Sequence, residues 1–285
     1  MFCVTLSSLR RHYPYQVLKG IISAHNSEHP LTSTLLNRVQ RYEEKLKIKN
    51  EKLKKCRCYK SIPFFFVPLR QNCRDMNTIK KQFAQKLMDI EAIKLQPNDP
   101  FTWASGWHSP IYTDNRKTLG YADVRSFVKL ELCHAIQQNF PEAEAVAGVA
   151  TGAIAQGALV ADELGLPYAY VRPKPKDHGM GNQVEGELKK GAKVIVVEDL
   201  ISTGGSSLKA VEALRQYGVE VIGMVASFTY GFPVAEEAFR EAGVKLITLS
   251  DYNAVLEQAA ETGYIKAEDL EVLKEWRKDP SNWKK

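Results

Sequence analysis

Cysteine is nearly absent from most of this sequence. Residues 76–285 contain a single cysteine, Cys133, so this part of the chain cannot form an internal disulfide, which suits the reducing cytoplasm. The other four cysteines come earlier, and three of them, Cys56, Cys58 and Cys73, lack the second cysteine pair or nearby histidine that a zinc site needs. We interpret these early cysteines as exposed thiols and expect a cytoplasmic protein.

Long apolar runs are also missing. No stretch approaches the roughly 18 to 20 consecutive apolar residues of a membrane-spanning helix, so we expect no membrane span. A secretory signal would combine a charged start, an apolar stretch of about 7 to 15 residues and a small-residue cleavage site, and none is visible. An organelle-targeting peptide stays open, because the start of the chain contains arginine and is poor in acidic residues.

Acidic residues are scarce in residues 1–75, here called the head. The head holds 15 Lys and Arg against 5 Asp and Glu, whereas residues 76–285 hold 24 against 28, so the net charge of +6 comes entirely from the head. A charge run of this kind is usually only solvated, and we expect no nucleic-acid partner. The head also offers too few apolar positions for a core. We predict that it is a disordered or non-native extension and that Met76 begins the functional domain, residues 76–285.

The sequence after Met76 alternates between helical and strand patterns. Apolar residues at helical spacing predict helices over 77–94 and 121–139. Short apolar runs predict strands, most of them followed by a helical pattern. These strands are expected around Phe101–Trp103 and at Ala145–Val149, Tyr168–Val171, Val194–Val197, Val221–Ser227 and Lys245–Leu249, with helices over 153–164, 206–217 and 234–242. Continuous apolar strands alternating with amphipathic helices indicate an α/β fold with a parallel sheet covered on both faces.

The most informative stretch is VIVVEDLISTGGSS, residues 194–207. Glu198 and Asp199 end a buried strand, at the sheet edge where ligands of α/β proteins bind. Gly204 and Gly205 permit close backbone approach, and the following helix N-terminus carries partial positive charge, which suits a phosphate. Carboxylates suit ribose hydroxyls, and a divalent cation can offset their charge. Further hydroxyl donors are expected from Ser202, Thr203, Ser206 and Ser207. The stretch has no Gly-Lys-Ser/Thr, so an ATP-hydrolysing P-loop is not indicated.

This stretch resembles the phosphoribosyl pyrophosphate (PRPP) motif of type I phosphoribosyltransferases, which joins apolar residues, two acidic residues and a Thr/Gly-rich loop. The resemblance implies PRPP binding by Glu198, Asp199, Leu200, Ile201, Ser202, Thr203, Gly204, Gly205 and Ser206. The run from Gly148 to Gly152 resembles the pyrophosphate loop of the same family. By that match Ala150 and Thr151 bind PRPP as well, although many members have Tyr-Lys at these two positions.

A second stretch, VRPKPKDHGMGNQVEG at residues 171–186, combines cations with glycines. A glycine-hinged flap can close over a polyanion, exclude water and then open to release product. The stretch resembles the mobile catalytic loop R-x-x-x-K-x-H-G of orotate phosphoribosyltransferases, which supplies charge to pyrophosphate across a dimer interface. By that match Arg172, Lys176 and His178 bind PRPP and are catalytic at a neighbouring subunit's site, together with Asp199. Where the family has a lysine directly after the arginine, this chain has Pro173.

A third stretch, FTWASGWHSPIY at residues 101–112, resembles the orotate-site signature S-G-x-x-S-P-x-Y of the same family. Amides and hydroxyls in such a turn can pair with the carboxylate and ring carbonyls of a planar acidic base. The resemblance implies orotate binding by Ser105, Gly106, Ser109, Tyr112 and Ser202. Many members carry a lysine before the Ser-Gly pair, where this chain has Ala104. The group that neutralises the orotate carboxylate therefore stays open, with His108 and Arg116 as candidates.

Taken together, the resemblance implies the type I phosphoribosyltransferase fold, with a central, mostly parallel sheet flanked by helices and a small N-terminal hood over the base site. It implies the conversion of orotate and PRPP to orotidine 5′-monophosphate and pyrophosphate, a step of de novo pyrimidine (UMP) synthesis. It also implies Mg²⁺, bound through PRPP near Glu198 and Asp199, and a homodimer whose flap is shared across the interface.

Two other functions stay open. A phosphoribosyltransferase for another base would share the PRPP motif, although the flap and the Ser-Gly-x-x-Ser-Pro turn together disfavour it. A PRPP-sensing regulator could keep the fold and lose catalysis, but it would have no need to retain the flap.

Overall fold

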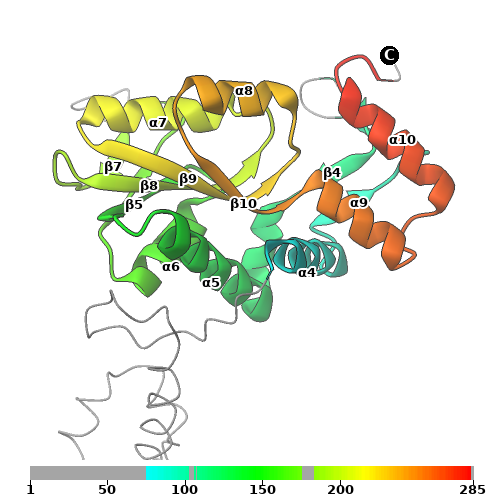
Figure 1. Cartoon of the computed structure of the whole chain (residues 1–285), viewed down its shortest axis with the longest axis horizontal. Helices are drawn as coiled ribbons and strands as arrows, with labels where there is room; N and C mark the ends of the chain where they lie inside the picture. Colours follow the sequence, from blue (N-terminus) through cyan, green and yellow to red (C-terminus); the bar gives the residue numbers. More distant parts are fainter. Residues whose placement is uncertain (1–74, 103–105, 107, 175–182, 284–285) are drawn as a thin grey trace, which may run out of the picture. The chain divides into compact units, whose positions relative to one another are not determined.

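The computed structural model describes residues 75–102, 106, 108–174 and 183–283. The predictions for residues 1–74 lie outside this part of the chain. At its centre is a six-stranded sheet with the order β10-β9-β8-β5-β6-β7 (Figure 1). Neighbouring strands are parallel except β7, which is antiparallel to β6. The strands are β5 (Ala145–Val149), β6 (Tyr168–Val171), β7 (Val184–Gly186), β8 (Lys193–Ile201), β9 (Glu220–Thr229) and β10 (Leu246–Asp251).

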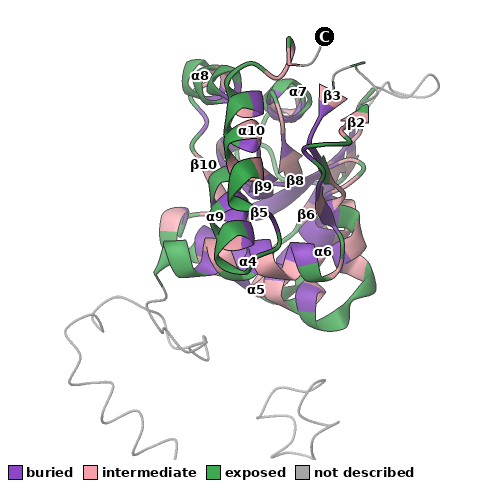
Figure 2. Ribbon diagram, turned by 90° about the vertical axis from the view of Figure 1, so that its right-hand side faces the viewer, coloured by how far each residue is buried: buried purple, intermediate pink, exposed green. Residues whose placement is uncertain are grey.

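Helices cover both faces of this sheet, as Figure 1 shows. One face carries α7 (Gly205–Tyr217) and α8 (Pro233–Glu241), and the other carries α5 (Ala122–Asn139) and α6 (Ile154–Leu164). Because side chains alternate along a strand, β8 contributes to two cores. Val194 and Val196 pack on the side of α7, while Ile195 and Val197 pack on the side of α5 and α6. In Figure 2 the buried residues accordingly lie along the strands, with exposed residues on the outer sides of the helices.

Smaller elements gather beyond one end of the sheet and form what we call the hood. Two short antiparallel pairs, β1 with β4 and β2 with β3, lie in the same region as the C-terminal helices (Figure 1). The hood consists of α4 (Met76–Asp89), β1 (Ile93–Leu95), β2 (Phe101–Thr102), β3 (His108–Ser109), β4 (Ile111–Thr113), α9 (Tyr252–Glu261) and α10 (Ala267–Lys278). A short 3-10 helix, η1 (Asn115–Gly120), leads from β4 to α5. The hood therefore uses both ends of the domain, whereas the sequence pointed only to the N-terminal part.

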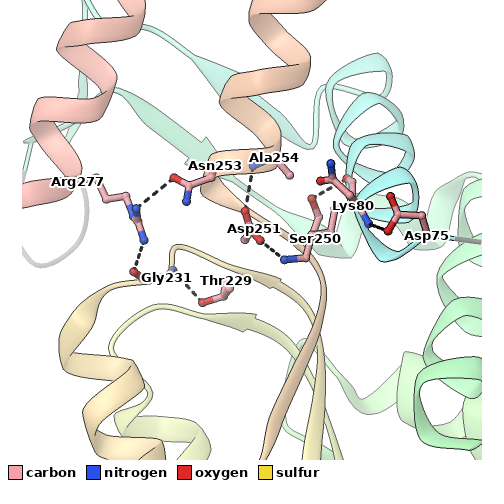
Figure 3. A network of polar contacts seen from close by, with 10 residues as sticks. Asp75, Lys80, Thr229, Gly231, Ser250, Asp251, Asn253, Ala254 and Arg277 are labelled. Carbon is pink, nitrogen blue, oxygen red and sulfur yellow. Dashed lines mark hydrogen bonds and ion pairs between the residues drawn. The ribbon is translucent and has the colours of Figure 1, made fainter. Parts of the chain in front are cut away.

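A polar network at the end of β10 joins the hood to the sheet (Figure 3). The Lys80 ammonium on α4 lies 2.6 Å from an Asp251 carboxylate oxygen, and Ser250 donates to the Lys80 carbonyl at 2.8 Å. The other Asp251 oxygen accepts from the Ala254 amide at 3.0 Å and caps α9. Asp251 at the end of β10 thus holds both α4 and α9, because each of its carboxylate oxygens accepts from a different helix.

Most predicted elements of the sheet are confirmed, two of them to the residue: the strands Ala145–Val149 and Tyr168–Val171. The predicted helix 77–94 is wrong at its end, because α4 stops at Asp89. Glu91 has a positive φ of 53°, which ends the helical path, and Ile93 instead pairs with Thr113 in β1. Strand β7 and helices α9 and α10 were not predicted. None of the helices among the described residues is long and apolar enough to cross a membrane.

Candidate active site

A pocket of about 300 Å³ opens where β5 and β8 end, at the carboxyl edge of the sheet. Two chain segments form it: the loop that follows β5, and the end of β8 with the loop that leads into α7. Its lining is Val149, Ala150, Thr151, Gly152, Glu198, Asp199, Leu200, Ser202, Thr203, Gly204 and Ser206. The structure therefore brings together the predicted pyrophosphate loop and most of residues 198–206, the predicted PRPP-binding residues of β8 and the loop after it. The two carboxylates lie inside β8, which continues to Ile201, rather than at its last residue.

Glu198 is held from within the protein. It is 4% exposed, and its side chain accepts from the Ser207 hydroxyl at 2.8 Å and from the Asp199 amide at 3.0 Å. Burial raises the pKa of Glu198 to about 8, and the neighbouring Asp199 carboxyl adds to the shift. The expectation that Ser207 donates to a ligand is wrong, because its buried hydroxyl is directed to Glu198.

Asp199 is half-buried and faces the loop after β5. A Cβ atom placed on Gly152 would lie 2.0 Å from the Asp199 Oδ2, so the carboxylate occupies the space that a side chain at this position would need. The peptide bond between Ala150 and Thr151 in the same loop is cis. Asp199 and the loop thus form one wall of the pocket, and glycine at position 152 is what allows them to approach.

The start of α7 forms the other wall. Gly204 precedes the helix with a φ of 82°, and a Cβ atom there would lie 3.0 Å from the Phe239 ring. Both facts require glycine. No side chain of the described residues caps α7, so its first amides remain available at the pocket, with Ser206 beside them. This is the arrangement in which a helix N-terminus binds an anion.

Arg172 follows β6, at the point where the predicted flap leaves the sheet. Its amide donates to the Gln183 carbonyl at 2.9 Å, and the Gln183 side chain donates back to the Arg172 carbonyl at 2.8 Å. The guanidinium lies 3.5 Å from a carboxylate oxygen of Glu185. The two ends of the flap are therefore fixed to each other. Lys176 and His178 lie outside the described residues.

The predicted base-binding residues are distributed over the hairpin β2–β3 and strand β4. Ser105 lies outside the described residues, and Gly106 is exposed with a φ of 83°. Ser109 is fully buried, and its hydroxyl donates to the Ile111 carbonyl at 2.8 Å, which shapes the step into β4. Tyr112 is 38% exposed, with its ring centroid 5.6 Å from that of Phe101. Ser202, the fifth residue, lines the pocket beside β8.

The two candidates for neutralising a base carboxylate differ in their surroundings. The His108 ring lies near the Thr102 hydroxyl, with Nδ1 and Oγ1 3.4 Å apart. Arg116 on η1 is exposed and bonded to Asp114 at 2.7 Å, which raises the pKa of Arg116. The charge of Asp199 adds to this effect, so the Arg116 guanidinium lies within electrostatic reach of the pocket.

Asn115 is a residue of the site that sequence reasoning missed. It is buried, and its side-chain amide donates to the Asp199 main-chain carbonyl at 2.6 Å. The Thr118 hydroxyl donates to the Asn115 carbonyl at 2.6 Å and lies 3.4 Å from the amide of Gln156 on α6. These contacts link the segment after β4 to Asp199 on β8 and to α6. The sequence offers only a hint, since Asn115 closely follows the stretch 101–112 that resembles the orotate-site signature.

The pocket suits a hard cation only in combination with a ligand. Its charged groups are two adjacent carboxylates, and oxygen is what Mg²⁺ prefers. The raised pKa of Glu198 reflects burial beside Asp199, a surrounding in which a cation would favour the ionised form. No group of three or more His, Cys, Asp or Glu among the described residues could hold a metal ion alone. The residues present therefore fit Mg²⁺ that shares its coordination with the oxygens of a substrate.

This chain is similar to known proteins. The phosphoribosyl transferase domain family matches residues 131–255. An orotate phosphoribosyltransferase of Porphyromonas gingivalis is 64% identical over 208 residues, which is 73% of this chain and 99% of that protein. One of Phocaeicola vulgatus is 65% identical over 208 residues, 73% of this chain and 98% of that protein. The crystal structure of orotate phosphoribosyltransferase from Aeropyrum pernix is 33% identical and superposes with a TM-score of 0.57, covering 65% of this chain and 99% of that one. This chain therefore belongs to the orotate phosphoribosyltransferase family.

Proposed function

We propose that this protein transfers the phosphoribosyl group of PRPP to orotate, giving orotidine 5′-monophosphate and pyrophosphate in UMP biosynthesis. The observation that carries the proposal is the pocket at the end of β8. There Asp199, the uncapped start of α7 and the loop 150–152 converge on one space of about 300 Å³, in a chain of this family.

The pocket offers a distinct group for each part of PRPP. The amides at the start of α7, with the hydroxyls of Ser202, Thr203 and Ser206, bind the 5′-phosphate, because unbonded amides and the helix dipole both favour an anion. Asp199 accepts hydrogen bonds from ribose hydroxyls. Glu198 is too deeply buried to do the same, and it supports Asp199 from behind through its bond to the Asp199 amide. Leu200, Ile201, Gly204 and Gly205 supply the backbone of this wall.

The diphosphate of PRPP lies against the loop after β5 in this proposal. Ala150 and Thr151 offer backbone amides and one hydroxyl there, and Asp199 lies on the other side of Gly152. Asp199, with Glu198 nearby, would help to hold Mg²⁺ together with the substrate, and the ion would supply positive charge that offsets the charge of the leaving pyrophosphate. Orotate occupies the hood side, against Ser105, Gly106, Ser109 and Tyr112.

The chemistry is a displacement at the anomeric carbon. A ring nitrogen of orotate forms the new bond to this carbon and gives up its proton, which the pyrophosphate takes up. The bond to the pyrophosphate oxygen breaks with its electron pair leaving on pyrophosphate. No residue need become covalently attached, so catalysis is mostly positioning and electrostatics. Arg172, Lys176 and His178 add positive charge when the flap closes, and closure also excludes water.

The assembly and the extent of the domain belong to the same proposal. We propose that residues 76–285 form the enzyme, and that the head is a disordered or non-native extension. The aligned length of 208 residues supports this, since it nearly equals the length of the chain from Met76 onward. We further propose a cytoplasmic homodimer in which the flap of one subunit serves the site of the other, with no nucleic-acid or membrane partner.

The test is a spectrophotometric assay of the full chain with PRPP, Mg²⁺ and a panel of bases. The proposal predicts consumption of orotate that requires PRPP, and little reaction with purine bases. Turnover of another base in preference to orotate would assign a different transferase. PRPP binding without turnover of any base would instead indicate a sensor.

A further inference from the structure

Helix α10 reaches both halves of the proposed site through two consecutive residues. Trp276 contacts one half directly, and Arg277 acts on the other through an intervening turn. One half is the base hairpin, formed by β2 and β3. The other is the phosphate strip, residues 198–206. The two halves come from distant parts of the chain, so their separation depends on what lies between them. Figure 1 shows α10 beside α9 and the hood strands.

Trp276 reaches the base hairpin. Its indole N–H donates to the His108 carbonyl at 3.1 Å, and His108 directly precedes the buried Ser109. The indole is itself fully buried in an aromatic cluster, with ring centroids 5.4 Å from Tyr252 and 5.6 Å from Phe232. A side chain packed on several sides has little freedom, so its hydrogen bond fixes the hairpin in place.

Arg277 reaches the phosphate strip through the turn after β9. Its Nη2 donates to the Gly231 carbonyl at 2.7 Å and its Nε to the Tyr230 carbonyl at 3.3 Å, while Asn253 on α9 accepts from Nη1 at 3.1 Å (Figure 3). The Tyr230 amide in turn donates to the Ile201 carbonyl at 3.0 Å. Ile201 is the last residue of β8, immediately before the donor-rich loop. The guanidinium therefore holds the backbone that supports the start of this loop.

We propose that α10 sets the relative position of the base and the PRPP, with Trp276 as a positioning residue for orotate and Arg277 as a positioning residue for PRPP. The inference rests on the proposed function. It follows from the order of the contacts, since Trp276 donates to the backbone of the base hairpin and Arg277 donates to the turn that supports the phosphate strip. Neither side chain needs to touch a substrate. Short strands such as β2 and β3 have few hydrogen bonds of their own, so an external support has a large effect on them.

The test measures the KM for orotate and the KM for PRPP separately in each variant. Trp276→Phe keeps an aromatic ring in the cluster and removes the N–H donor, so the KM for orotate should rise roughly five- to tenfold, the effect of one hydrogen bond, with the KM for PRPP changed less than about twofold. Arg277→Met keeps the aliphatic stem and removes the donors. The KM for PRPP should then rise by a similar factor, while that for orotate stays nearly constant.

Two control variants lose comparable hydrogen bonds elsewhere. Tyr217→Phe removes a half-buried hydroxyl that donates to the Leu188 carbonyl at 3.4 Å, at the end of α7. Arg215→Met removes a guanidinium that donates to the Ala242 carbonyl at 3.0 Å, at the end of α8. Both should lower the melting temperature to a similar extent as the test variants and leave both KM values nearly unchanged.

The inference stands or falls on which of the two KM values rises in each variant. The inference would be overturned by the opposite pairing of residues and substrates, by equal rises in both KM values, or by no change in either test variant. A rise in the Tyr217→Phe control would overturn it as well. These results presuppose an active unmodified chain. If the unmodified chain fails to convert orotate, the proposed function is contradicted and the inference falls with it.

Discussion

The phosphate strip and the base hairpin are built in opposite ways. The strip continues from β8, a nine-residue strand that is paired on both sides, with β5 and with β9, and buried between two cores. The hairpin consists of two strands of two residues each, paired only with each other among the described residues. The rigid half is the one proposed to bind the phosphates, and the weakly supported half is held by a helix from the far end of the chain. Variants can therefore separate the effects of the phosphate strip, which the sheet supports, from those of the base hairpin, which α10 supports.

The largest effect is expected outside both halves, on the flap. Lys176→Ala should lower turnover by about 10²-fold or more, because the residue is proposed to stabilise charge that develops on the leaving pyrophosphate. The melting temperature should hardly change, since a flap contributes little to the core. Lys174→Ala is the matched control, because Lys174 is an exposed lysine of the same segment that does not match the family motif. Equal losses in both variants, or none in either, would contradict a specific role for Lys176.

A smaller but still large effect is expected where the strip meets the loop after β5. Gly152→Ala places a methyl group where the Asp199 carboxylate lies, so the carboxylate must move. We expect the KM for PRPP to rise about tenfold or more, with the KM for orotate less affected, as measured by steady-state kinetics. Gly120→Ala serves as the control, because a Cβ atom there has nothing within 4 Å. Normal PRPP kinetics in Gly152→Ala would show that Asp199 does not need its present position.

The smallest effect concerns stability and pH. Burial raises the pKa of Glu198 from its ordinary value of 4.5 to about 8. Between these two pH values the folded protein keeps a proton that the unfolded chain releases. Stability of the ligand-free protein should thus be greatest below about pH 4.5 for this group and should fall as the pH rises to about 8, with up to about one proton involved. Glu198→Gln should flatten this slope in thermal melts.

Exposed Glu236→Gln is the control for that experiment and should leave the slope unchanged. An unchanged slope in Glu198→Gln would mean that another group carries the titration. The result also bears on the comparison of the two halves, because it measures how strongly burial in the sheet raises the pKa of Glu198 beside Asp199.

The sequence predicted the phosphate strip better than its surroundings, and the reason is physical. A buried strand, an acidic pair and a glycine-containing helix start are neighbours along the chain, so VIVVEDLISTGGSS contains the whole arrangement. The roles of Ser207 and Asn115 depend on contacts that form only in the folded protein. Ser207 is turned towards Glu198 by α7, and Asn115 meets Asp199 from a segment 84 residues away.

The hood was the least predictable part. Helix α4 ends at Asp89 because Glu91 takes a left-handed conformation and Ile93 pairs with Thr113, and neither fact follows from apolar spacing. The bond from Trp276 to His108 joins residues 168 positions apart. Local patterns predict elements that are stabilised locally, whereas short strands that are held by distant helices require the tertiary structure.

Calorimetric titration of PRPP tests the central claim most directly. The account holds that Asp199, near the end of β8, binds the ribose of PRPP, so Asp199→Asn should weaken PRPP binding by about tenfold or more. Asp162→Asn, an exposed aspartate on α6, should bind PRPP like the unmodified chain. Equal affinity in Asp199→Asn and in the unmodified chain would contradict the account.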